Sequence, residues 1–380
     1  MKETSTRRSF LKKGVAVVAA AIGGRATASA ARKPFKRKSP SSTELIEVGV
    51  ITCAYFSHIE DVWGPVMNPV GEKDGTYWPR QSGMIMTMVW DPDKEAAENF
   101  AKKYDLKVAK NYYDMVDRVD GVILSDFYST GWWPQLSKPY LEAGMPALIN
   151  RPFAQSLKEA KEMVAVSKAN KAPILVPSAD EYMFETIQAR HRLRLLLQEG
   201  AKVTGVMAFE PSDEYHAHGV HGIYNVHAIL EPNVVEVGMY ADKWWKWGLD
   251  GALMNWRVKG KEDCPDYFVS IRMSVEYDTN GWIMISTTKG RIFVPNDFVG
   301  EDFTRFRNLF VPTIIEFQKM IETRTMPQSH EHIMAKTTTV LTGFYSNQEH
   351  DGNMVACVDL PETWRAPQVQ PDRIPDDIFK

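Results

Sequence analysis

Residues 46–58 read IEVGVITCAYFSH, an apolar run that gives way to a polar and aromatic loop. The pattern predicts a buried strand followed by a turn, as in folds where a strand ends at closely spaced glycines and a helix N-terminus approaches a pyrophosphate. Here Gly49 lies inside the strand, while Thr52, Ala54 and Ser57 stand where the loop glycines are expected. The stretch therefore predicts a nucleotide-binding type of fold whose loop is altered.

Beyond this stretch, apolar runs of strand length alternate with amphipathic helical patterns. The alternation predicts a Rossmann-like, doubly wound parallel sheet within residues 45–178, in an α/β protein. Residues 63–83, rich in glycine, proline and aromatic residues, are expected to form a long surface loop. The strands are expected near 46–53, 84–90, 120–125 and 146–150, and the helices near 93–104, 133–143 and 156–169.

From about residue 202 the apolar residues recur on a period of two. This alternation predicts a large, mostly antiparallel open sheet in a C-terminal α+β domain, residues 179–365. Residues 366–380 are expected to be a tail. Helices are expected near 217–230, 308–323 and 330–346.

The composition fits a globular protein. The chain has 380 residues, 44% of them hydrophobic, and a formal net charge of −3, which offers no basic field for nucleic acid. Cys53, Cys264 and Cys357 show no spacing typical of metal or redox pairs, so they are expected to be isolated and buried.

The N-terminus indicates export. Ser5-Thr6-Arg7-Arg8-Ser9-Phe10-Leu11-Lys12 precedes a modest apolar run and Ala28-Ser29-Ala30, and resembles a twin-arginine signal with its cleavage site. We expect residues 1–30 to be this signal and residues 31–44 a linker. The twin-arginine export machinery would then be a partner and the periplasm the destination, and a cofactor carried through that route must be held tightly.

The middle of the chain carries a resemblance to a known family. Residues 142–153, EAGMPALINRPF, contain Glu-Ala-Gly at the end of an expected helix and Asn150-Arg151-Pro152 after an expected strand. This arrangement resembles the Gfo/Idh/MocA family, and with Asp91 the resemblance extends over about residues 45–360. It implies an N-terminal dinucleotide-binding domain and a C-terminal domain that binds substrate and whose open sheet often forms a dimer face, so a homo-oligomer is expected.

The resemblance also implies a chemistry. Members of the family remove hydride from a sugar or polyol carbon with NAD or NADP. The lysine of a Glu-Lys-Pro motif accepts the hydroxyl proton, helped by an Asp-x-x-x-His pair. In this chain those positions hold Arg151, Ala217 and His221. Arginine stays protonated and cannot act as a general base, although its planar fork can bind a carboxylate or hydroxyl.

A cluster of histidines surrounds His221. His218 and His221 are three residues apart and share a helical face. His221 is a candidate acid or base lining a substrate pocket, with His218 as a further catalytic candidate. His218 and His221 with Asp213 or Glu214 would alternatively form a divalent-metal site, and simple packing histidines are the third interpretation. The window contains His216, His218, His221 and His227.

Other residues complete the expected site. Asp91 ends the second strand, where an acid would bind a ribose or cap the next helix. With Asp91, the expected cofactor contacts are Thr52, Ala54, Ser125, Asp126 and Arg151.

The expected substrate contacts are Asp180, Tyr182 and Tyr224. Residues 242–248, DKWWKWG, would stack on a sugar or lie at a dimer contact. His330 and His332 are expected to cap a helix rather than to catalyse.

Three functions follow from these residues. The first is an exported sugar or polyol oxidoreductase with tightly bound NAD or NADP, in which His221 accepts the proton and Arg151 positions substrate. The second is a non-redox carbohydrate lyase or hydrolase that uses the histidines, with a divalent metal where one is bound. The third is a non-catalytic carbohydrate-binding protein.

Overall fold

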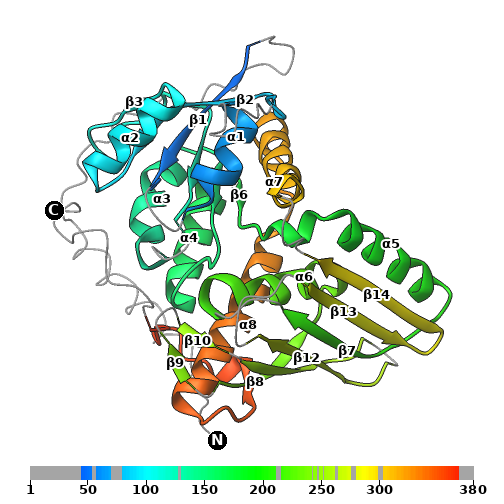
Figure 1. Cartoon of the computed structure of the whole chain (residues 1–380). Coiled ribbons are helices and arrows are strands. Elements are labelled where there is room, and N and C mark those ends of the chain that lie inside the picture. The colour runs from blue at the N-terminus through cyan, green and yellow to red at the C-terminus, as the bar shows by residue number, and fades with distance from the viewer. Residues whose placement is uncertain are drawn as a thin grey trace, which may run out of the picture. The chain divides into compact units, whose positions relative to one another are not determined.

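A six-stranded parallel sheet forms the first half of the molecule (Figure 1). Its strand order, β3-β2-β1-β4-β5-β6, is that of a dinucleotide-binding sheet, and the expected fold class is confirmed. The computed structural model describes residues 44–53, 57–69, 79–126, 130–210, 215–241, 243–245, 248–250, 252–261, 264–274, 280–297 and 303–367. The strands are β1 (Ile46–Ile51), β2 (Met84–Trp90), β3 (Lys107–Val108), β4 (Gly121–Leu124), β5 (Ala147–Ile149) and β6 (Ile174–Leu175).

Helices connect these strands and begin at well-defined caps. The Asp93 side chain accepts a hydrogen bond from Ala96 N at 3.1 Å, and the Ser156 side chain accepts one from Glu159 N at 3.2 Å. The helices are α2 (Lys94–Tyr104), α3 (Trp133–Glu142) and α4 (Leu157–Asn170), close to the expected ranges.

The expectation of a surface loop over residues 63–83 is wrong for the first part of that range. A π-helix (Ile59–Trp63) runs into the short helix α1 (Gly64–Met67), and the Trp63 and Met67 side chains are buried. Both side chains pack into the core of the parallel sheet. The glycine and proline content of this stretch indicated a loop, so the sequence analysis did not predict this packing. Residues 70–78 lie outside the described residues.

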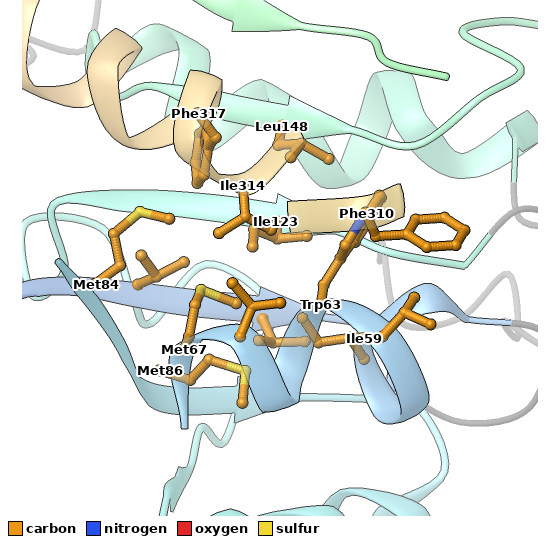
Figure 2. Packing of buried hydrophobic residues seen from close by; sticks show 14 of the residues in the cluster. Ile59, Trp63, Met67, Met84, Met86, Ile123, Leu148, Phe310, Ile314 and Phe317 are labelled. Atoms are coloured by element: carbon orange, nitrogen blue, oxygen red, sulfur yellow. The ribbon is translucent and has the colours of Figure 1, made fainter. Parts of the chain in front are cut away.

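A helix from much later in the chain completes that core. Helix α7 (Phe303–Thr323) places Phe310, Ile314 and Phe317 in the same apolar cluster as Met84 and Ile123 of the parallel sheet (Figure 2). The sheet's core is therefore built from two segments that are separated in the sequence by most strands of the second half of the molecule.

The second half contains a seven-stranded sheet in the order β14-β13-β7-β12-β11-β8-β15, in which only β7 and β12 pair in parallel. A separate ribbon pairs β9 (Lys243–Trp245) with β10 (Gly248–Asp250). The strands of the large sheet are β7 (Val203–Glu210), β8 (Val234–Tyr240), β11 (Leu253–Val258), β12 (Tyr267–Met273), β13 (Asn280–Thr287), β14 (Gly290–Asp297) and β15 (Val355–Ala356).

Three helices accompany this sheet: α5 (Phe184–Gln198), α6 (Val220–Leu230) and α8 (His330–Glu349). A π-helix (Tyr215–Gly219) leads into α6, whose residues are buried through Ile229. The sequence patterns did not predict α5. None of the helices in the described part of the chain is both long and apolar enough to span a membrane.

Candidate active site

The site is centred on Arg151, which follows β5 at the carboxyl end of the parallel sheet. Its side chain is only 1% exposed. The guanidinium Nη2 atom donates to His221 Nε2 at 2.7 Å, and Nη1 lies 3.3 Å from His58 Nδ1 and 3.2 Å from Asn150 Oδ1. The two residues that the sequence singled out, Arg151 and His221, therefore lie in direct contact.

This contact determines where His221 carries its proton. A guanidinium group only donates hydrogen bonds, so His221 Nε2 must accept with its lone pair. The neutral ring then carries its hydrogen on Nδ1, which lies 2.6 Å from Ser178 Oγ and donates to it. Ser178 thus holds His221 in the tautomer whose Nε2 atom can accept a proton.

The same logic applies to His58, which the sequence analysis did not identify. Its Nδ1 atom faces two donors, Arg151 Nη1 and, at 3.4 Å, Asn150 Nδ2, so it accepts as well. Two imidazole lone pairs therefore converge on one guanidinium group. His58 ends the stretch quoted at the start, and its position just past a strand's carboxyl end was the available signal.

Both rings are held neutral. Burial and then the Arg151 charge lower the pKa of His221 well below 6.5, with smaller contributions from His218 and His58. The pKa of His58 is lowered in the same way by desolvation, Arg151 and His218, although Asn150 opposes the shift. A neutral imidazole can accept a proton, so this site contains two potential bases of low basicity.

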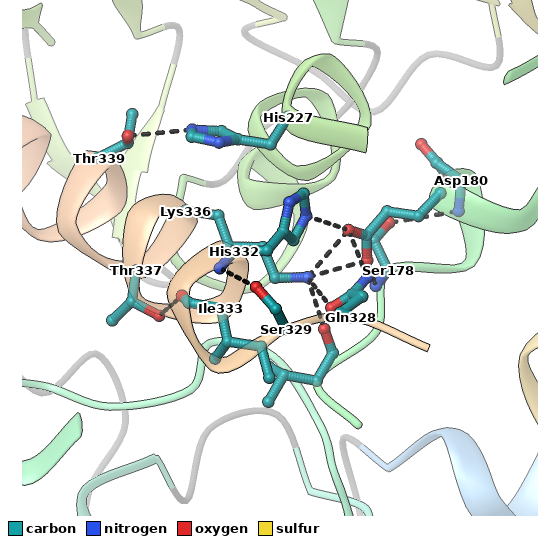
Figure 3. Close-up of polar contacts among 12 residues, drawn as sticks. Ser178, Asp180, His227, Gln328, Ser329, His332, Ile333, Lys336, Thr337 and Thr339 are labelled. Carbon is teal, nitrogen blue, oxygen red and sulfur yellow. Dashed lines mark hydrogen bonds and ion pairs between the residues drawn. The ribbon is translucent and has the colours of Figure 1, made fainter. Parts of the chain in front are cut away.

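A buried ion pair between Lys336 and Glu181 supports the turn that carries Ser178 (Figure 3). Lys336 Nζ on α8 lies 2.9 and 3.1 Å from the Glu181 carboxylate oxygens, and donates to Val176 O at 2.7 Å and Gln328 Oε1 at 2.8 Å. Glu181 also accepts from Ser178 N at 2.7 Å. The turn that carries Ser178 is therefore fixed by a fully buried lysine.

The charges of this pair are mutually stabilised. Burial acts to raise the pKa of Glu181, but Lys336, His332 and the Ser178 N–H outweigh it, so the net shift is downward. Burial lowers the pKa of Lys336, and Glu181 opposes that shift. The lysine ammonium also lies 4.0 Å from the centre of the Tyr224 ring.

The expected cofactor residues gather at the ends of β1, β2 and β4. Thr52 adopts a left-handed backbone, with φ of 62°, at the first loop position where a glycine was expected. Its side-chain oxygen accepts from Asp126 N at 3.2 Å, and Ser125 Oγ donates to its carbonyl. Thr52, Ser125 and Asp126 are thus brought together, whereas Ala54 lies outside the described residues.

Asp91 is buried at the end of β2 and binds backbone. Its Oδ2 accepts from Cys53 N at 2.7 Å and its Oδ1 from Asp93 N at 2.9 Å. The helix cap itself is Asp93. Asp91 thus lies at the strand end where the sequence placed an acid that binds a ribose.

The three expected substrate residues lie in different surroundings. Asp180 and Tyr224 are fully buried, and burial raises the pKa of Tyr224. Tyr182 lines a cavity of about 390 Å³ together with Glu181, His227 and others. A substrate contact by these three residues remains a prediction.

The remaining candidates are only partly described. His218 is half-buried, with its ring centre 6.3 Å from that of His221. Within the described residues no three His, Cys, Asp or Glu side chains could hold a metal ion, and Asp213 and Glu214 lie outside them. The side chains of His216, Ala217 and residues 242–248 also lie outside what the structure describes.

The remaining histidines and the cysteines are described. Ser329 caps α8, and His330 and His332 begin that helix beside the cap. The three cysteines are free; Cys53 is buried, whereas Cys264 and Cys357 are half-buried rather than buried as expected.

Comparisons with known proteins agree with this architecture. The sequence profile of the oxidoreductase family with an NAD-binding Rossmann fold, Gfo/Idh/MocA, matches residues 67–177. No curated protein sequence matches the chain.

Solved structures share the fold at low sequence identity. Myo-inositol dehydrogenase from Lactobacillus casei, solved with NAD(H) and myo-inositol, is 16% identical, with a TM-score of 0.66 over 82% of this chain and 96% of that one. Scyllo-inositol dehydrogenase from the same organism is 11% identical, with a TM-score of 0.66 over 83% and 100%. An oxidoreductase from Agrobacterium radiobacter is 12% identical, with a TM-score of 0.60 over 82% and 98%. The family profile thus identifies residues 67–177 as related to the Gfo/Idh/MocA oxidoreductases, and the strand order of the parallel sheet and the second, mixed sheet agree with the fold of the solved dehydrogenases.

Proposed function

We propose that this protein is an exported oxidoreductase that acts on a hydroxyl group of a sugar or polyol with tightly held NAD or NADP. One observation carries the proposal: His221, at the family's histidine position, is a neutral buried base whose Nε2 atom faces the residue that replaces the family's lysine. The family itself and the inositol dehydrogenases of the same fold support it.

The described residues support a nucleotide at the ends of β1, β2 and β4. Asp91 is the acid at the strand end where a ribose would bind, and Thr52 keeps the backbone turn without glycine. Bound NAD or NADP would supply the hydride acceptor. Ser125 and Asp126, on the neighbouring strand end, would border that cofactor.

The site's own residues provide the proton chemistry. At 2.7 Å, the Arg151–His221 bond leaves no room for an oxygen atom between the two groups, so substrate binding requires Arg151 to turn aside. The substrate hydroxyl then donates to His221 Nε2 and accepts from the guanidinium group, which stabilises the developing negative charge on oxygen. Ser178 keeps His221 in the correct tautomer throughout.

Export is proposed from the leader. Paired arginines, an apolar run of modest hydropathy and small residues at the expected cleavage point support the twin-arginine route. Because that route carries folded protein, a cofactor bound before export would stay with its subunit.

A second candidate function has one specific observation in its favour. His58 adds a second neutral imidazole at the other terminal nitrogen of Arg151, and hydride transfer does not need two such bases. A carbohydrate lyase uses a neutral base to remove a carbon-bound proton while an arginine stabilises the charge that develops, and these three residues provide both.

Native mass spectrometry of the mature protein from an exporting host tests the proposal. A retained mass of one dinucleotide per subunit, together with sugar-dependent reduction of NAD or NADP that His221→Gln lowers by roughly 10²–10⁴-fold, supports it. His350→Gln is the matched control, because His350 is an exposed histidine at the end of α8.

Subunits without nucleotide overturn the redox proposal. Sugar cleavage that depends on His58 and His221 would then support the lyase, and loss of that cleavage with a chelator would indicate a metal. Sugar binding that His221→Gln leaves intact, with no turnover, would indicate a carbohydrate-binding protein.

A further inference from the structure

Helix α5 presents a row of large apolar side chains to solvent. Phe184 is 70% exposed, Ile187 42% and Leu195 46%. With the exposed His191 they recur at spacings of three and four residues, so all four side chains lie along one side of the helix. We call Phe184, Ile187, His191 and Leu195 the α5 stripe.

The opposite side of α5 attaches the helix to the molecule. Its buried residues are Thr186, Ala189 and Leu193, and the helix contacts β14 and α6. Figure 1 shows α5 running along the outer side of β14 and β13. The α5 stripe therefore faces away from the sheet, and no other described part of the chain covers it.

Cationic side chains flank the α5 stripe on both sides. At about 100° per residue, Arg192 lies on one side of the stripe and Arg190 and Arg194 on the other. All three arginines are exposed, and none forms an ion pair with another described residue. The helix carries three arginines against a single carboxylate, that of Glu185.

This charge pattern argues against a second copy of the chain as the occupant. The α5 stripe is centred near residue 190, so a two-fold axis through its middle would bring Arg190 and Arg192 of one copy beside the same residues of the other. Like charges facing each other at a contact are destabilising. The pattern instead complements a surface that is negatively charged and apolar beneath.

We propose that the α5 stripe docks on the surface of a bilayer that contains anionic lipids. Phe184, Ile187 and Leu195 would enter the boundary between headgroups and acyl chains, while the three arginines bind lipid phosphates, as in helices that lie in a membrane interface. This inference is independent of the proposed reaction, because no residue of the α5 stripe belongs to the Arg151–His221 site.

Co-sedimentation with phosphatidylglycerol/phosphatidylcholine vesicles tests the proposal, with pure phosphatidylcholine vesicles for comparison. The leader is itself basic and partly apolar, so each variant is compared with a parent chain that has the same N-terminus. Phe184→Ser with Leu195→Ser should lower the partition coefficient for anionic vesicles by roughly tenfold or more. Arg192→Gln with Arg194→Gln should lower it by roughly fivefold per arginine and should weaken its salt dependence.

Matched controls come from other elements. Val358→Ser removes a side chain that is 90% exposed, and Arg118→Gln removes an exposed arginine near the parallel sheet, so neither should change vesicle binding. Circular dichroism verifies that each variant is folded. Vesicle binding that the α5 variants leave unchanged would overturn the proposal. So would an effect of those variants on self-association or on capture of an acidic protein without an effect on vesicle binding.

Discussion

Arg151 donates to His221 Nε2 across 2.7 Å, so a guanidinium group occupies the lone pair that a proton acceptor needs. Without substrate, the Nε2 atom of His221 is therefore occupied by Arg151. Substrate must compete with an internal charge-assisted hydrogen bond, and the chemistry of His221 depends on where the guanidinium group goes.

Removing the Arg151 charge should change the pH dependence of catalysis. In Arg151→Met the pKa of His221 should rise, because the arginine's charge is one of its lowering causes, but it should stay below 6.5 because burial, the larger cause, remains. His221 must be deprotonated to act, so the acidic limb of kcat/KM should move to higher pH. Arg118→Met, which changes an exposed arginine, should leave the profile in place.

Ser178 is expected to act as a positioning residue. Ser178→Ala removes the acceptor of the His221 Nδ1 hydrogen, so the ring can adopt the other tautomer, and kcat should fall by roughly ten- to a hundredfold with little change in KM. Ser178→Thr keeps a hydroxyl group and should restore most of the activity. Equal kcat values for the alanine and threonine variants would contradict this role.

Stability should fall as the pH drops below about 6.5. The pKa values of His58, His221 and His227 are lowered well below 6.5, mainly by burial, so between their folded-state pKa values and about 6.5 the unfolded chain binds more protons than the folded one. The free energy of unfolding should then decrease by up to about 1.4 kcal/mol per pH unit for each histidine. Urea unfolding at pH 7.5, 6.5 and 5.5 measures this loss, and a flat dependence over that range would contradict it.

The Lys336–Glu181 pair should be essential for stability. Lys336→Met leaves the Glu181 carboxylate buried without its partner and should cost about 3–5 kcal/mol in urea unfolding. Adding Glu181→Gln should recover part of that loss. Lys319→Met, which breaks an exposed pair with Glu316, should cost less than about 1 kcal/mol.

The open face of the second sheet should form an interface between subunits. Met207, Phe268 and Phe293 are 52%, 56% and 61% exposed on β7, β12 and β14. Phe268→Lys should therefore lower the oligomeric state in analytical ultracentrifugation, since a buried unpaired charge at an apolar contact is destabilising. A parent chain that sediments as a monomer would contradict the expected homo-oligomer.

Local signals in the sequence predicted much of the fold. The strand 84–90 and the helix that follows it were expected almost to the residue, because an apolar run and a helical pattern define them locally, although the cap is Asp93 and not Asp91, which the sequence offered. Helix α5 was missed because its apolar residues lie on two opposite sides, which obscures the helical period. The burial of Trp63 and Met67 depends on α7, which is remote in sequence.

The site was predictable only through the family resemblance. Arg151 and His221 are 70 residues apart, and no local pattern places them together. His58 and Ser178 were missed for a related reason, because each acts through contacts with residues distant in the sequence. Spacing along the chain cannot reveal such contacts.

Helix α7 also determines when the molecule can fold. Phe310, Ile314 and Phe317 complete the core of a sheet whose first strand begins at Ile46, so a ribosome must synthesise most of the chain before that sheet can close. The core of the first half is therefore completed only after α7 has been synthesised. In the proposed export, the leader emerges first, and the core of the parallel sheet that it carries closes only once α7 is available.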